Sequence, residues 1–218
     1  MQLILGSKNY SSWSLRAWLA AVLSGQPFDE VLIHFDQDSD RAERLRHSPT
    51  GKVPALEDGG ILVWDSLAIS EYLAERFPYA GLWPEDRAAR AWARAISAEM
   101  HSGFQDLRQE LPMNIRKLVP WRERSAGTMA DIARIDRIWS ETRAKFGKKI
   151  GGPFLFGRPS LADAFYAPVV ARFQTYQPPL STEAGTYAEA AWNWDPMRTW
   201  CAAARTEGHE LPAYDAKA

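Results

Sequence analysis

The sequence predicts a two-part chain: an α/β domain with the element order β-α-β-α-β-β-α, followed by a domain made only of helices. Two observations predict it. Short β-prone runs alternate with helical patterns up to about residue 78, which is typical of an α/β sheet. After Pro84 the β-prone runs stop, and apolar residues recur every three or four positions, as in helices. We therefore assign residues 1–78 to the α/β domain, 79–85 to a linker and 86–218 to the all-α domain.

The first half of the α/β domain predicts two strands that flank a helix. An apolar run at 2–5 ends at Gly6, and apolar residues from Leu15 to Leu23 then share one helix face, with Gly25 just past the end as a cap. The run 28–33 is typical of a second strand, and the charged run 41–46 predicts a short exposed helix. A helix between two strands indicates that the strands are parallel.

The second half of this domain predicts a hairpin and a helix. Two β-prone runs, 53–57 and 61–64, flank Asp58-Gly59-Gly60, which is a hairpin signal. Asp65-Ser66 then begins a helix whose apolar side includes Ile69 and Leu73. We expect the hairpin to add an antiparallel edge to the parallel pair.

Four helices are predicted in the all-α domain. Apolar spacing indicates a long helix over 92–111, ended by Pro112, and a second over 129–146. Ser160-Leu161-Ala162-Asp163 is a capping box with Asp in place of the usual Glu, and it precedes an apolar helix that runs through Tyr176. The run 196–207, which contains Trp200, predicts the last helix.

Composition excludes several function classes. The formal net charge of −1 gives no electrostatic reason to expect nucleic acid or an anionic membrane as partner. The one cysteine, Cys201, cannot form an internal disulfide, and no cluster has metal-ligand spacing. The N-terminus lacks a positive stretch and an apolar run of signal-peptide length, and no run is long enough to span a membrane. We expect a cytoplasmic protein without a metal.

The first candidate site is the start of the first helix, Ser11-Ser12-Trp13-Ser14-Leu15-Arg16. A serine there is first of all an N-cap, worth about 1 kcal/mol. The free N–H groups of a helix start also stabilise a thiolate: lowering a thiol pKa by about two units corresponds to about 2.7 kcal/mol. No cysteine stands at this position, so a thiolate has to come from a ligand, and a serine hydroxyl would donate a hydrogen bond to it.

Two further motifs carry both a structural and a functional interpretation. In Lys52-Val53-Pro54, the proline suits a strand edge, and equally a cis peptide that leaves the Val53 backbone free to pair with a bound peptide. Asp65-Ser66 suits a helix cap. The same pair suits an amino-acid head group, with Ser66 and nearby N–H groups taking a carboxylate and Asp65 an ammonium.

These three motifs together resemble the glutathione-site motifs of the glutathione transferases. The serine motif and the run Asp65-Ser66-Leu67-Ala68-Ile69 are most similar to the zeta and tau classes, and Ser160-Leu161-Ala162-Asp163 resembles the family's capping box. The resemblance covers essentially the whole chain. It implies a thioredoxin-like first domain, glutathione as co-substrate, no metal, and a homodimer.

The resemblance also implies roles for single residues. Ser11 is expected to be the catalytic hydrogen-bond donor to the thiol, with Ser12 and Ser14 as alternatives, and Ser12 is counted among the glutathione contacts. Val53 would pair with the cysteinyl backbone and Lys52 would meet the glycyl carboxylate. The remaining expected contacts are Pro54, as a cis-proline, and Asp65 and Ser66, which would hold the γ-glutamyl group. Asp163 is expected to be structural.

The second substrate is expected in a cleft between the domains, lined by Tyr10, Trp13, Met100 and Phe104, although interdomain core is an equal interpretation for each. The resemblance implies transfer of glutathione to a small hydrophobic electrophile. Two alternatives stay open: a glutathione-dependent isomerase of the maleylacetoacetate isomerase type, and a non-catalytic protein-binding member of the fold. Trp13 stands where zeta-class enzymes have cysteine, which weighs against the isomerase. Ser11 and Ser14 occupy the positions of a C-x-x-C pair, which disfavours dithiol chemistry.

Overall fold

The computed structural model describes residues 1–34 and 38–215. Among these residues, strands β1 (Gln2–Leu5), β2 (Asp29–Leu32), β3 (Ala55–Asp58) and β4 (Ile61–Trp64) form one mixed sheet in the order β2-β1-β3-β4. β1 pairs in parallel with β2 and antiparallel with β3, and β3 pairs antiparallel with β4. The predicted parallel pair with an antiparallel hairpin at its edge is confirmed.

Backbone geometry explains the hairpin between β3 and β4. Gly59 and Gly60 have φ angles of 56° and 88°. A two-residue hairpin turn with both central residues at positive φ matches the twist of its strands, and glycine adopts that conformation without a steric penalty. This turn brings Ala55 opposite Trp64. The hairpin therefore places the residue before β3, Pro54, and the residue after β4, Asp65, at the same end of the sheet.

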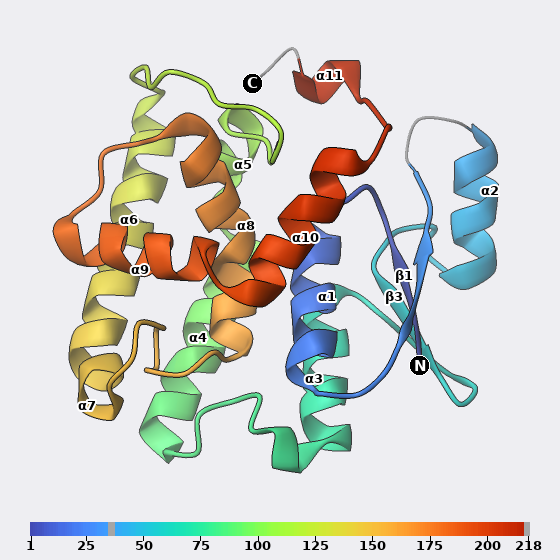
Figure 1. Cartoon of the computed structure of the whole chain (residues 1–218), viewed down its shortest axis with the longest axis horizontal. Coiled ribbons are helices and arrows are strands. Elements are labelled where there is room, and N and C mark those ends of the chain that lie inside the picture. The colour runs from blue at the N-terminus through green and yellow to red at the C-terminus, as the bar shows by residue number, and fades with distance from the viewer. Residues whose placement is uncertain (35–37, 216–218) are drawn as a thin grey trace.

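Three helices complete the first domain: α1 (Ser12–Leu23), α2 (Asp38–His47) and α3 (Ser66–Arg76). Figure 1 shows α1 and α3 side by side on one face of the sheet and α2 on the opposite side. The start of α1 and the start of α3 both lie near the junction with the helical domain. Burial of Leu15, Leu19, Ile69 and Leu73 fixes the two helices against the sheet.

The second domain is all-helical in the described residues. After a short 3-10 turn (Pro78–Ala80), its helices are α4 (Arg87–Ser102), α5 (Gln105–Glu110), α6 (Ala126–Thr142), α7 (Lys148–Ile150), α8 (Leu161–Tyr176), α9 (Thr182–Trp192), α10 (Asp195–Thr206) and α11 (Pro212–Asp215). A π-helical turn (Arg143–Gly147) joins α6 to α7. The almost fully buried α8 packs against α1, α4 and α9, so the α1–α8 contact joins the two domains.

The predicted single helix over 92–111 is wrong: it is two helices. α4 ends at Gly103, whose backbone is extended, and Phe104 has a φ of 61° before α5 begins. A Cβ on Gly103 would lie 2.8 Å from the Glu99 carbonyl oxygen, so the chain turns where only glycine fits. Arg108 donates from its side chain to the carbonyls of Met100 and Gly103, which satisfies the end of α4.

The sequence did not predict α9, α11 or the three-residue α7. The buried side of α9 consists of Ala184, Tyr187, Ala188 and Ala191. Small residues give a weak periodic signal, because their hydrophobicity contrasts little with that of the exposed face. The capping box before α8, in contrast, is confirmed: the Asp163 carboxylate accepts hydrogen bonds from the backbone N–H and the hydroxyl of Ser160 at 2.9 Å each.

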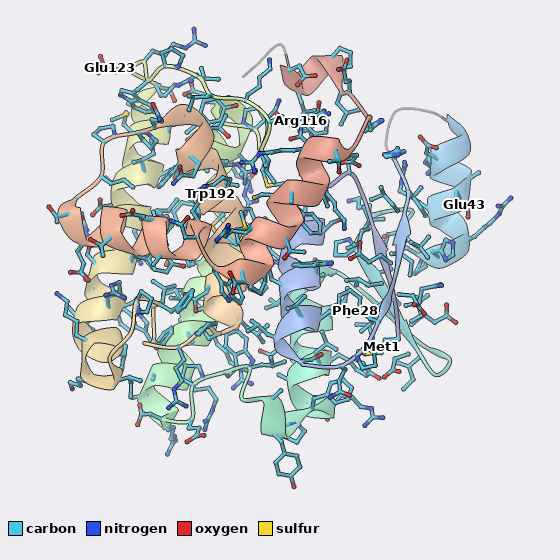
Figure 2. All side chains as sticks on the ribbon, in the orientation of Figure 1. Met1, Phe28, Glu43, Arg116, Glu123 and Trp192 are labelled. Carbon is cyan, nitrogen blue, oxygen red and sulfur yellow. The ribbon has the colours of Figure 1, made fainter. Side chains whose placement is uncertain are left out.

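The chain's last described segment folds back over the first domain. Arg116, labelled in Figure 2, lies beside the end of α10 and donates to the carbonyls of Glu207 and His209. Asn114 donates to the Asp215 carboxylate at 2.7 Å. These bonds hold α11 beyond the end of α10 (Figure 1).

Candidate active site

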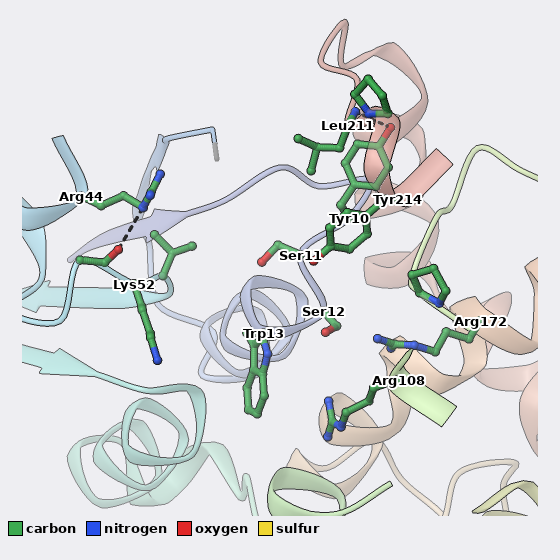
Figure 3. Close-up of a pocket in the computed structure, with 14 residues that line it drawn as sticks. Tyr10, Ser11, Ser12, Trp13, Arg44, Lys52, Arg108, Arg172, Leu211 and Tyr214 are labelled. Atoms are coloured by element: carbon green, nitrogen blue, oxygen red, sulfur yellow. Dashed lines mark hydrogen bonds between the residues drawn. The ribbon is translucent and has the colours of Figure 1, made fainter. Parts of the chain in front are cut away.

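Two adjoining cavities open at the N-terminal end of α1. The larger has a volume of about 560 Å³ and lies between the two domains (Figure 3). The smaller, of about 380 Å³, lies between α1, the residues before β3 and the start of α3. Trp13, Lys52 and Val53 line both cavities. The two spaces are therefore neighbours with a shared wall.

Ser11 caps α1 and borders the larger cavity. Its Oγ accepts a hydrogen bond from the Ser14 N–H at 3.2 Å and donates one to Ser14 Oγ at 2.8 Å. Ser14 Oγ also accepts from the Gly6 N–H at 2.9 Å and is fully buried. The structural interpretation of Ser11 as an N-cap is thus confirmed, and its hydroxyl also lines the cavity.

The Ser12 hydroxyl has different surroundings from the Ser11 hydroxyl. It lines the larger cavity, and within the described chain its Oγ has no hydrogen-bond partner. Figure 3 shows its side chain on the side of the cavity where Arg172 and Arg108 lie. Both serines are nearly buried. The structure therefore offers two serine hydroxyls at the start of α1, of which only the Ser11 hydroxyl is engaged in capping.

The Val53–Pro54 peptide bond is cis. Pro54 precedes β3, which begins at Ala55, and neither Val53 backbone group forms a backbone hydrogen bond among the described residues. Val53 lines both cavities and Pro54 the smaller. A backbone edge that faces a cavity with its polar groups unpaired can accept an extended ligand as an added strand. Lys52, beside it, is exposed at the mouth of both cavities.

Asp65 begins α3 in an unusual backbone conformation. Its φ of 77° and ψ of 136° are sparsely populated by residues other than glycine, and such conformations cost free energy and cluster at functional sites. One carboxylate oxygen accepts from the Leu67 N–H at 2.7 Å and, more weakly, from the Ala68 N–H at 3.4 Å. The other oxygen lies 3.4 Å from Nε2 of His101 in α4. The Asp65 side chain thus caps α3 and touches the helical domain.

Ser66 carries the clearest signal of a binding position. The residue is fully buried, and its Oγ has no hydrogen-bond partner among the described residues. It lines the smaller cavity together with Asp65 and Trp13. A buried hydroxyl without a partner costs about 1–3 kcal/mol. A ligand oxygen in the smaller cavity would remove that cost.

The structure places only part of the predicted electrophile pocket at a cavity wall. Tyr10 and Trp13 line the larger cavity. Met100 and Phe104 line neither cavity, and both belong to the hydrophobic core, with exposures of 0% and 7%. The interdomain-core interpretation fits those two, because the turn at Gly103 directs the end of α4 into the domain.

The Tyr10 hydroxyl is fully engaged away from the cavity. It donates to the Asp215 carboxylate at 3.1 Å and accepts from Arg116 Nη2 at 2.9 Å and from the Leu211 N–H at 3.2 Å. One donor and two acceptor positions are all that a hydroxyl offers. Tyr10 therefore holds the C-terminal segment in place.

Two kinds of residue line the larger cavity without having been predicted from the sequence. Arg108 and Arg172 line the larger cavity, and so do Leu211, Pro212 and Tyr214 of the C-terminal segment. A signal existed for Arg172, which is the only charged residue in the apolar run 164–176. The C-terminal residues had none, because their place depends on how the chain returns to the first domain.

His101 contacts the site from the helical domain. Its ring packs edge-on against Trp13 with centroids 5.1 Å apart. Burial lowers the pKa of His101, the nearby carboxylate of Asp65 partly opposes this, and the charges of Arg16 and Arg108 add to the lowering. The neutral imidazole is therefore the favoured form at this contact.

Two structural features are absent from the described residues. Over the described residues, no group of three or more His, Cys, Asp or Glu side chains has the geometry to hold a metal ion. Within residues 1–34 and 38–215, no helix combines the length and the apolar character needed to cross a bilayer.

The mixed sheet followed by a helical domain places the described chain in the two-domain thioredoxin-like class. The family model "Glutathione S-transferase, N-terminal domain" matches residues 10–76, and "Glutathione S-transferase, C-terminal domain" matches residues 90–203. The chain belongs to the glutathione S-transferase family.

Curated relatives include isomerases. Maleylacetoacetate isomerase of Rattus norvegicus is 31% identical over 189 residues, which cover 82% of this chain and 81% of the relative. Maleylpyruvate isomerase of a Ralstonia species is 27% identical over 186 residues, with 78% and 84% covered. This chain is similar to both.

Solved structures share the fold. A glutathione transferase homologue from Burkholderia with bound glutathione superposes with a TM-score of 0.69 at 21% identity, covering 94% of this chain and 98% of that one. A bacterial zeta-class maleylpyruvate isomerase has a TM-score of 0.69 at 23% identity, covering 96% and 100%. At these identities the likeness shows the fold.

Proposed function

We propose that this chain binds glutathione across the two cavities and activates its thiol at the N-terminus of α1. The smaller cavity would take the γ-glutamyl group, with Asp65 facing the ammonium and Ser66 the carboxylate. Val53 would pair with the cysteinyl backbone, and Lys52 would face the glycyl carboxylate. The observation that carries the proposal is the fully buried Ser66 hydroxyl, which lines a cavity and has no hydrogen-bond partner among the described residues.

The thiol would be activated by the first turn of α1. Free N–H groups at a helix start stabilise an anion. Ser11 would add a hydrogen bond by turning its hydroxyl proton from Ser14 Oγ, now 2.8 Å away, to the sulfur. It would still accept the Ser14 N–H, so donation to the thiolate would leave the helix cap intact. Ser12, whose hydroxyl forms no hydrogen bond within the described part of the chain, is the alternative donor.

Two reactions would use such a thiolate. In transfer, the sulfur forms a bond to an electrophilic carbon of the second substrate; the leaving group departs with its electron pair, and the thiol proton goes to water. In isomerisation, the sulfur adds to a carbon–carbon double bond, rotation follows, and elimination returns the thiolate unchanged. We propose transfer as the first reaction. Isomerisation is the second candidate, because the relatives of Rattus norvegicus and Ralstonia are named isomerases.

Calorimetric titration with glutathione tests the binding step. We compare the wild type with the double variant Asp65→Ala/Ser66→Ala, and follow ionisation of the bound thiol by its ultraviolet absorption. Wild type is expected to bind, the double variant to lose at least tenfold in affinity, and the bound thiol to ionise below its free value. Ser70→Ala is the matched control, because the Ser70 hydroxyl, buried in the same helix, donates only to the Ser66 carbonyl at 2.8 Å.

The result separates the three candidate functions. Absence of binding at millimolar glutathione would overturn the proposal. Binding without a lowered thiol pKa would favour a non-catalytic member of the fold. Turnover that consumes glutathione indicates transfer, whereas turnover that leaves its concentration constant indicates isomerisation. We also propose a cytoplasmic homodimer, and sedimentation of the purified chain tests the dimer.

A further inference from the structure

The two carboxylate oxygens of Asp65 have different partners. Oδ1 accepts hydrogen bonds from the Leu67 and Ala68 N–H groups at 2.7 and 3.4 Å, which caps α3. Oδ2 lies 3.4 Å from Nε2 of His101, which comes from α4. A ligand ammonium that binds Asp65 and leaves the cap intact has to approach Oδ2. It would therefore meet the carboxylate beside the imidazole.

Charged groups from three parts of the chain act on the His101 imidazole. Asp65 precedes α3, Arg16 belongs to α1 and Arg108 to α5, and of these three only Asp65 is acidic. From α8, the ring of Phe165 lies 6.3 Å from the imidazole between centroids. The His101 side chain is 23% exposed, so solvent protons reach it in the folded protein. The imidazolium therefore depends on Asp65 for its compensating charge.

Arg16 already draws on the same negative charge. It is fully buried, and none of its side-chain nitrogens has a hydrogen-bond partner among the described residues. Burial lowers the pKa of Arg16, and the charge of Asp65 acts in the opposite direction. Any further cation beside Asp65 has to share a carboxylate that also compensates this buried guanidinium.

Two added cations would repel each other at this carboxylate. Like charges within about 4–6 Å disfavour each other's charged form. An imidazolium on Oδ2 and a ligand ammonium on the same oxygen would lie within that range, whereas a neutral imidazole causes no such repulsion. Burial lowers the pKa of His101 and so favours the neutral form in the protein without ligand.

We propose that His101 is a positioning residue for glutathione, which acts through Asp65. Its neutral imidazole leaves the carboxylate to the ammonium of the γ-glutamyl group, whereas its imidazolium takes Oδ2 and competes with that ammonium. Glutathione affinity is therefore expected to fall when the solution becomes acidic enough to protonate His101. The inference rests on the proposed glutathione function and adds a control of that site by pH.

Two ligands that differ only in the ammonium test the competition. S-methylglutathione has no ionisable thiol, so ionisation of sulfur does not contribute to the pH dependence of its binding. Glutaryl-S-methylcysteinylglycine lacks the α-amino group and keeps both carboxylates. Calorimetry at about pH 7 and about pH 5 compares the two ligands where their carboxyl and amino groups largely keep their charge.

The two ligands are expected to respond differently to acid. S-methylglutathione should bind about three- to tenfold more weakly at about pH 5 than at about pH 7, because its ammonium competes with the imidazolium. The analogue without the amino group should show no such loss. The same loss for both ligands, or no loss for S-methylglutathione, would overturn the proposal.

Proton NMR measures the coupling from the side of His101. The chain has four histidines, and the signal that is missing in H101Q identifies this one. Saturation with S-methylglutathione is expected to lower the His101 pKa by about half a unit to one unit, because reciprocal binding effects share one coupling free energy. An unchanged or raised pKa would contradict the competition.

Variants assign the effect to position 101. H101Q carries no charge at either pH and is expected to bind S-methylglutathione with the same affinity at both. H101K places a permanent cation beside Asp65 and is expected to bind at about pH 7 as weakly as the wild type does at about pH 5. H47Q is the matched control, because His47 lies in α2, 3.4 Å from Glu43, and lines neither cavity.

Failure of this inference can be distinguished from failure of the proposed function. If neither glutathione nor S-methylglutathione binds, both fail. If S-methylglutathione binds with the same affinity at both pH values, the glutathione site stands and the role of His101 falls. If H101Q keeps the full pH dependence, the assignment to His101 is wrong. If H101Q does not fold, the comparison of the two ligands in the wild type decides.

Discussion

Nε2 of His101, in α4, lies 3.4 Å from Oδ2 of Asp65, at the start of α3. This contact joins the helical domain to the residue that is proposed to bind the ammonium group of glutathione. The same imidazole packs edge-on against Trp13. The three side chains come from α4, from α1 and from the N-cap of α3, and they join the two domains beside the smaller cavity, which Trp13 and Asp65 line.

The His101 contact makes stability depend on pH. Burial lowers the pKa of His101 in the folded protein, so the unfolded chain takes up a proton near pH 6.5 that the folded chain does not. The folded state then binds fewer protons, and stability falls as the pH decreases through about 6.5. We expect H101Q to reduce the difference in unfolding free energy between about pH 7.5 and about pH 5.5. Urea denaturation at both pH values measures this difference. If H101Q leaves the difference unchanged, His101 is not the source of the pH dependence.

Replacement of Ser66 should separate stability from binding. In S66A the unpartnered buried hydroxyl disappears, so the unfolding free energy is expected to stay the same or rise slightly. Glutathione affinity is expected to fall by about ten- to a hundredfold, because a hydrogen bond to a carboxylate is worth about 1.5–3 kcal/mol. Denaturation and calorimetry on the same preparation check both parts. A variant that binds glutathione normally would show that the Ser66 hydroxyl does not contact the ligand.

Replacing Ser11 or Ser12 by alanine should have different effects on stability and on the pKa of the bound thiol. S11A removes the N-cap and is expected to cost about 1 kcal/mol of stability. If Ser11 donates to the thiolate, S11A also raises the pKa of the bound thiol by about 1–2 units. S12A leaves the cap intact and is expected to leave the thiol pKa unchanged. Ultraviolet titration of bound glutathione in both variants measures the pKa of the bound thiol. If that pKa rises only in S12A, Ser12 and not Ser11 donates to the thiolate.

Asp163 is expected to matter for stability alone. Its carboxylate accepts from the Leu155 N–H at 3.1 Å and from both the N–H and the hydroxyl of Ser160. In D163N, the side-chain NH₂ would face a hydrogen-bond donor, so a buried N–H would lose its acceptor. We expect the free energy of unfolding to fall by about 2–4 kcal/mol. D195N, at the exposed start of α10, is the control. Urea midpoints of both variants provide the measurement, and equal midpoints would contradict the role.

Much of the first domain could be predicted because its signals are local. The alternation of β-prone and helical runs, the glycine pair at 59–60 and the cap before α3 each depend on residues close in sequence, and each is confirmed. The long helix over 92–111 was predicted wrongly because its break depends on contacts that the local pattern does not show. Its periodicity continues through the break, and Gly103 and Phe104 adopt their turn because Arg108 and the Asp131 carboxylate meet the freed backbone groups from outside the turn.

The sequence by itself determined the order of strands and helices in the first domain and the residues at the starts of α1 and α3, since short-range periodicity and capping chemistry encode these. The family followed from the resemblance of three short motifs. Only the tertiary structure decided which side chains share the cavities. Arg108, Arg172 and Tyr214 are separated by tens of residues, and they meet because α8 packs on α1 and the C-terminal segment is held by Tyr10 and Arg116. Burial and the distances between charges are properties of that packing. The charge of the cavity therefore became visible only in the folded chain.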